Sequence, residues 1–147
     1  MRATLAALLA GLVIGCLVMA CARPLEPPEW QRRQGKMTEI TTLWAQIREW
    51  RRVAHMELDP TPADMFQWRS RPVKEVEKVC PDGHEVPPAC GDISNLADAI
   101  CDNAETICGI ADELGKDDHD AQEKCASAKA SCREAKQRRC ACADGKP

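Results

Sequence analysis

The most regular pattern of apolar positions lies in the second half of the chain. Apolar residues return every three or four positions in one stretch, at Ile93, Ala97, Ile100, Ala104, Ile107, Ala111 and Leu114. A second stretch keeps this spacing with small residues, at Ala121, Cys125, Ala128, Cys132 and Ala135. Such spacing places each set on one face of an α-helix, and Gly115 between them is typical of a helix end. The sequence therefore predicts an antiparallel helical hairpin at roughly 93–114 and 118–139.

A further amphipathic helix is predicted ahead of the hairpin, from Thr38 to Met56. Its apolar stripe comprises Ile40, Leu43, Trp44, Ile47, Trp50, Val53 and Ala54, and its polar face comprises Arg48, Glu49, Arg51 and Arg52. Thr38 is a residue type favoured as an N-cap, and Asp59-Pro60 is a sequence that stops a helix.

Two short helices are predicted to follow. Thr61 followed by Pro62 is typical of a capped helix start, which predicts a helix over about residues 62–69. Another short helix is predicted after Pro72, with one apolar side formed by Val73, Val76 and Val79.

The Trp-bearing stripe is too apolar to remain exposed. A contiguous surface formed by Trp44, Ile47 and Trp50 exceeds what a monomer normally leaves in contact with water. We expect it to bind a protein partner, and packing onto the hairpin is the alternative.

The spacing of the cysteines supports the hairpin. Cys101 with Cys132 and Cys108 with Cys125 have residue numbers that add to the same total, as partners across an antiparallel hairpin do. A disulfide needs Cα atoms about 4.4–6.8 Å apart, whereas helix axes usually lie about 8–10 Å apart. The alanines on the facing sides of the two predicted helices, which form the seam of the hairpin, let the helix axes come closer together. The same register predicts flanking ion pairs, Asp98 with Lys136 and Glu105 with Lys129.

Four further cysteines lie near the open end of this hairpin. Extending the hairpin register predicts a disulfide between Cys90 and either Cys142 or Cys140. Cys80 would pair with whichever of these two cysteines remains. Both connectivities remain open from the sequence.

The first twenty residues have the layout of a secretory signal peptide. Arg2 precedes a charge-free stretch from Ala3 to Ala20, and Val18-Met19-Ala20-Cys21 follows. This ending resembles the lipobox of bacterial lipoproteins, which implies that Cys21 is lipidated and becomes the mature N-terminus. Cys16 is a second lipobox candidate. An uncleaved membrane anchor and plain secretion are the alternative interpretations.

With Cys21 as the lipidated residue, the sequence predicts four segments. They are a signal peptide (1–20), a lipidated Cys21 with a Pro-rich tether (21–36), an amphipathic helical region (37–79) and a disulfide-stapled hairpin (80–147). Ala22 after the cysteine resembles the signal for outer-membrane sorting. The whole layout is similar to cysteine-rich helical lipoproteins of Gram-negative envelopes, which implies a location facing the periplasm but no activity.

Composition narrows the functional classes. The chain of 147 residues has ten cysteines, one Phe, four Trp and no Tyr, with a net charge of −3. That charge excludes a strongly basic nucleic-acid binder. No motif for a catalytic nucleophile, a phosphate loop or a zinc protease occurs, so we expect neither an enzyme nor a cofactor.

With Cys21 lipidated, the eight cysteines after it can all form disulfides in an oxidising periplasm. The hairpin needs these crosslinks because its hydrophobic core is small. We therefore expect a structural or protein-interaction module. The alternative is a periplasmic protein that handles copper, zinc or thiols, because cysteines on a helical hairpin are similar to those of the bacterial four-helix copper-storage proteins. We expect no metal site, since no pair of cysteines has the zinc-ribbon spacing.

Overall fold

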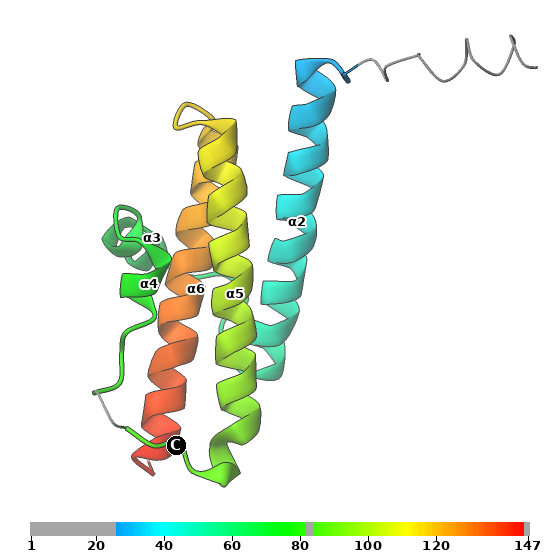
Figure 1. The fold of residues 1–147 in the computed structure, drawn as a ribbon. Helices are drawn as coiled ribbons and strands as arrows, with labels where there is room; N and C mark the ends of the chain where they lie inside the picture. The colour runs from blue at the N-terminus through cyan, green and yellow to red at the C-terminus, as the bar shows by residue number, and fades with distance from the viewer. Residues whose placement is uncertain (1–25, 82–83, 146–147) are drawn as a thin grey trace, which may run out of the picture.

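The structure is a computed structural model that describes residues 26–81 and 84–145. Its elements are α2 (Glu29–Val53), α3 (Pro62–Trp68), α4 (Val73–Val76), the 3-10 turn η1 (Pro88–Cys90), α5 (Gly91–Leu114) and α6 (His119–Ala143). No strand occurs in these two ranges, and α5 and α6 form an antiparallel hairpin, which confirms the predicted all-α class (Figure 1). The predicted signal peptide, Cys16 and Cys21 lie outside the described residues.

Gly115 ends the first helix of the hairpin, as predicted, and an aspartate caps the second. Gly115 ends α5 with φ of 99°, a left-handed conformation that glycine adopts without a steric penalty. Asp118 then caps α6, and its carboxylate accepts a hydrogen bond from the backbone N–H of Ala121 at 3.3 Å. These two residues fix the point at which the chain reverses.

Helix α2 begins nine residues earlier than Thr38, the predicted start, so the predicted tether is helical from Glu29 onward. Glu29 follows Pro28 and places a negative charge in the first turn, where it interacts favourably with the helix dipole. Thr38 lies inside the helix, and its hydroxyl donates to the carbonyl oxygen of Gln34 at 2.9 Å. The predicted cap at Thr38 is therefore wrong, because the charged residues before it also favour a helix.

The C-terminus of α2 is a Schellman motif without glycine. His55 has φ of 55°, its N–H donates to the carbonyl of Arg52, and the N–H of Met56 donates to the carbonyl of Arg51. The helix thus ends at Val53, three residues before the predicted end, because a left-handed residue stops it before Asp59-Pro60 is reached.

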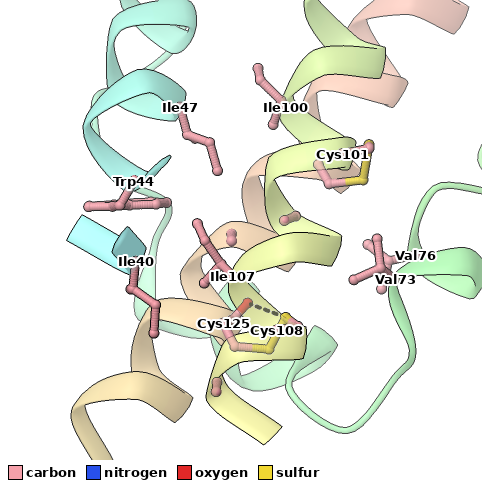
Figure 2. Packing of buried hydrophobic residues seen from close by; sticks show 14 of the residues in the cluster. Ile40, Trp44, Ile47, Val73, Val76, Ile100, Cys101, Ile107, Cys108 and Cys125 are labelled. Carbon is pink, nitrogen blue, oxygen red and sulfur yellow. Dashed lines mark hydrogen bonds between the residues drawn. A yellow bond between two sulfur atoms is a disulfide. The ribbon is translucent and has the colours of Figure 1, made fainter. Parts of the chain in front are cut away.

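One hydrophobic core joins α2 to the hairpin. Ile40, Trp44 and Ile47 of α2 point toward Ile100 and Ile107 of α5, as Figure 2 shows, and all five are buried. The two regions predicted as separate units on either side of residue 80 therefore contribute to a single core.

Helices α3 and α4 contact α6 and lie on the opposite side of the hairpin from α2 (Figure 1). The predicted cap of α3 is confirmed, because the Thr61 hydroxyl accepts from the N–H of Asp64 at 3.2 Å. Val73 and Val76 of α4 are buried, as their spacing predicts. Within the described ranges, none of the helices is both long and apolar enough to cross a membrane.

Candidate functional site

Two disulfide bonds join the facing sides of α5 and α6. Cys101 pairs with Cys132 and Cys108 with Cys125, and the Cα atoms in each pair are 4.7 Å apart. So short a distance requires small residues along the seam. The seam alanines Ala97, Ala104, Ala111, Ala121, Ala128 and Ala135 are all buried. The predicted register of the hairpin is confirmed.

Two outer disulfides close the other end of the hairpin. Cys90 pairs with Cys142 at a Cα–Cα distance of 6.1 Å, and Cys80 pairs with Cys140 at 5.6 Å. The structure thus selects one of the two connectivities that the sequence leaves open. Residues two apart on an α-helix point to nearly opposite sides, so Cys140 and Cys142 each receive a different segment of the preceding chain.

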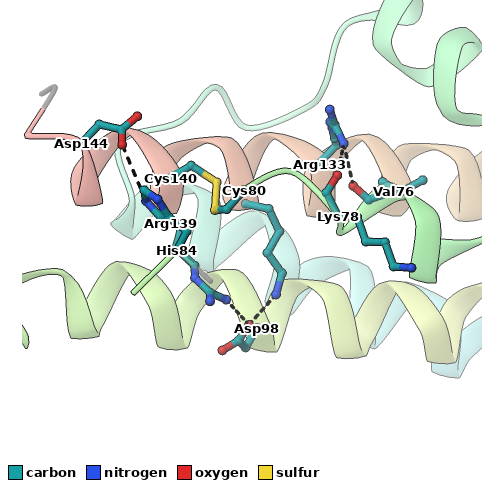
Figure 3. The surroundings of a disulfide bond; sticks show 10 residues. Val76, Lys78, Cys80, His84, Asp98, Arg133, Arg139, Cys140 and Asp144 are labelled. Atoms are coloured by element: carbon teal, nitrogen blue, oxygen red, sulfur yellow. Dashed lines mark hydrogen bonds and ion pairs between the residues drawn. A yellow bond between two sulfur atoms is a disulfide. The ribbon is translucent and has the colours of Figure 1, made fainter. Parts of the chain in front are cut away.

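One of the two predicted flanking ion pairs is present. The Asp98 carboxylate lies 2.5 Å from Lys136 Nζ and 3.2 Å from Arg139 Nη1 beside the Cys80–Cys140 bond (Figure 3). The predicted pair of Glu105 with Lys129 is wrong, because Lys129 Nζ instead donates to the carbonyl oxygen of Arg69 at 3.0 Å. Burial lowers the pKa of Lys129, and the carboxylate of Asp112 partly offsets that effect.

The stripe predicted to bind a partner is covered by the protein's own hairpin. Trp44 is 6% exposed, Ile47 is fully buried, and Trp50 is half-buried against the same core. Lys124 of α6 lies over the Trp44 ring at 5.4 Å, which adds a cation–π contact. These three residues are therefore core residues, and the alternative of packing onto the hairpin is the correct one.

Arg51 belongs to this buried face, although its charge suggests the polar face. Its side chain has no exposed surface, its Nε donates to the carbonyl oxygen of Glu57 at 2.7 Å, and its Nη2 lies 2.8 Å from Glu134 Oε2. The spacing Ile40, Trp44, Ile47, Arg51 identifies it, because each residue follows the last by three or four positions.

The histidines do not converge. His84 Nε2 lies 3.7 Å from Asp144 Oδ1, next to the Cys80–Cys140 bond (Figure 3). His55 lies just after the C-terminus of α2, and His119 begins α6. Among the residues that the structure describes, no group of three or more His, Cys, Asp or Glu side chains could hold a metal ion.

An apolar groove lies where α2 ends and the hairpin continues beyond it. Figure 1 shows that α5 and α6 extend past the C-terminus of α2. The groove has a volume of about 600 Å³, and its lining includes Met56, Ile93, Leu96, Ile100, Arg138 and Ala141. Sequence analysis missed this groove because its position depends on where α2 stops relative to α5.

Comparisons with family models, curated proteins and solved structures return no match to this chain.

Proposed function

We propose that this chain is a lipid-anchored module of the Gram-negative envelope that faces the periplasm and serves a structural or protein-interaction role. The observation that carries the proposal is the set of four disulfide bonds, which pair all eight cysteines between residues 80 and 142. Disulfides persist in oxidising compartments such as the bacterial periplasm and are rare in the cytosol.

The position of the first turn of α2 supports an anchored protein. The first turn of α2 lies at the same end of the bundle as the hairpin turn, where Arg33 Nε is 2.7 Å from Asp118 Oδ2 (Figure 1). A helix of 25 residues is about 37 Å long. A lipid on Cys21 would thus hold one end of the bundle near the membrane and direct the groove and outer disulfides away from it.

Lipid attachment is tested by metabolic labelling with palmitate in a Gram-negative host. The expected result is that the full-length chain is labelled and fractionates with the outer membrane, whereas Cys21→Ser is not labelled. Cys16→Ser is the matched control and should keep the label, since it removes the other lipobox cysteine. Label that persists in Cys21→Ser would overturn Cys21 as the anchor.

The structural role is tested separately, by the intact mass of exported protein with and without reductant. Four bridges predict a gain of about 8 Da on reduction, two hydrogens for each bond. Free thiols in the native chain together with bound copper or zinc would overturn the structural role in favour of metal handling.

A further inference from the structure

We propose that the groove at the open end of the hairpin binds a single hydrocarbon chain that carries an anionic head group, as in a free fatty acid. This proposal goes beyond anchoring and does not depend on it, because the groove lies at the end of the bundle opposite the first turn of α2 (Figure 1).

The apolar wall of the groove is the uncovered part of the α5 stripe. Ile100 and Ile107 are fully buried beneath α2, whereas Ile93 and Leu96 on the preceding turns are only half-buried. The stripe therefore continues beyond the C-terminus of α2, because the left-handed residue His55 stops α2 at that level. A bound alkyl chain would remove this remaining apolar surface from water.

Arg138 provides the charge complementarity for an anion. Within the described residues its guanidinium makes one hydrogen bond, from Nη1 to the carbonyl oxygen of Ala54 at 3.1 Å, and no ion pair. The neighbouring cations Lys136 and Arg139 both pair with Asp98. No Asp or Glu lines the groove, so Arg138 is its only charged lining residue among those described.

The size and rigidity of the groove favour one small amphiphile over a protein helix. A volume of about 600 Å³ lies within the roughly 300–1,000 Å³ typical of small-molecule sites. Cys142 is part of the lining and is fixed to Cys90, and Met56 is held by its hydrogen bond to Arg51. A preformed site of this kind loses little free energy to ordering when it binds.

The test is isothermal titration calorimetry on residues 22–147, exported behind a signal peptide that is removed without lipidation; these residues include all of the described fold and neither lipobox cysteine. Octanoate, decanoate and dodecanoate should bind with one-to-one stoichiometry. Affinity should rise about fourfold for each methylene group added while the chain still fits, because each buried methylene contributes about 0.8 kcal/mol. Dodecyltrimethylammonium has a similar chain and the opposite charge, so it should bind more weakly than dodecanoate.

Two variants locate the site. Arg138→Gln should weaken dodecanoate about fivefold and leave dodecanol unchanged, since only the anion uses the charge. Leu96→Glu places a carboxylate in the apolar wall and should weaken both ligands about tenfold or more. Arg48→Gln is the matched control, because it removes the same charge from the surface of α2, where Arg48 pairs with Asp59 at 3.3 Å.

The intact mass must show four disulfides in each variant. If Leu96→Glu fails this check, the chain-length series and Arg138→Gln decide the test alone. Three results would overturn the proposal: no saturable binding of dodecanoate below its micelle concentration, equal affinity for dodecyltrimethylammonium, or equal affinity in Arg138→Gln. Concentration-dependent dimerisation that Leu96→Glu abolishes would also overturn it, in favour of a second copy of the chain.

Discussion

At the scale of the residue, the least expected group is a charge in the core. Arg51 continues the stripe of Ile40, Trp44 and Ile47, and its side chain is fully buried. Its Nη1 has no hydrogen-bond partner among the described residues. The ion pair with Glu134 thus offsets only part of the free energy needed to remove the guanidinium from water.

Arg51 can therefore be replaced by an apolar side chain of similar length. Arg51→Ala should lower the free energy of unfolding by about 3 kcal/mol, since it leaves a void and an unpaired Glu134. Arg51→Met fills the volume and should stay within about 1 kcal/mol of the parent protein. Urea denaturation measures both, and Arg48→Met is the exposed control, with an expected change of about 0.5 kcal/mol or less. If Arg51→Met lowers the free energy of unfolding as much as Arg51→Ala does, an apolar side chain cannot replace Arg51.

At the scale of the element, the hairpin depends on small residues at its seam. Ala128 of α6 is fully buried between the Cys108–Cys125 and Cys101–Cys132 bonds, whose Cα atoms are 4.7 Å apart. Ala128→Leu adds volume that the seam can take only by separating the helices. The expected result is loss of one or both bonds by peptide mapping and about 3 kcal/mol of destabilisation. Ala45→Leu, on the exposed face of α2, should preserve all four bonds.

The ion pair between Arg33 of α2 and Asp118 at the hairpin turn should make the stability of the fold depend on pH. Hydrogen bonding from Arg33 lowers the pKa of Asp118, burial opposes this effect, and the N–H of Ala121 supports it. Because the folded-state pKa is depressed, this contact stabilises the fold above the unfolded-state pKa of about 4. The stabilisation is lost as the pH falls through the folded-state pKa.

Arg33→Gln should therefore raise the pKa of Asp118 toward its ordinary value, as followed by carboxyl carbon-13 NMR. The stability difference from the parent protein should be present at pH 7 and shrink on acidification toward pH 3. Arg32→Gln removes a neighbouring charge, which lies 3.8 Å from Glu26, and should leave the Asp118 titration unchanged. A difference that grows on acidification would contradict the assignment.

The sequence predicts the elements whose signals are local. Gly115 and Thr61 are recognisable because each satisfies a backbone requirement at its own position. The end of α2 is missed, since His55 adopts a left-handed conformation that residue type alone does not indicate. The groove is missed for the same reason. It arises because the C-terminus of α2 lies short of the first turns of α5, and that offset exists only once the helices are packed.

At the scale of the whole molecule, three of the four disulfides are nested, and the fourth, Cys80–Cys140, crosses the outermost of them, Cys90–Cys142. Their sequence separations are 17, 31, 52 and 60, so independent crosslinks would differ in their entropic contribution by about 1 kcal/mol. In this arrangement, each bond adds only the loop that lies between itself and the neighbouring bond. The Cys80–Cys140 bond, next to Cys90–Cys142, closes a loop of about 12 residues, ten on one side and two on the other.

Removing any one bond by a double change to alanine should thus lower the free energy of unfolding by about 3 kcal/mol. Cys80→Ala with Cys140→Ala, across the longest separation, should match Cys108→Ala with Cys125→Ala, across the shortest. Guanidinium denaturation of both double variants measures the difference, once intact mass shows that three bonds remain in each. A loss at least 1 kcal/mol greater for the Cys80–Cys140 pair would show that the bonds act independently. Equal decreases in the free energy of unfolding would show that the inner bonds already restrict most of the unfolded chain. The Cys80–Cys140 bond then adds only the restriction of the segment from Cys80 to Cys90.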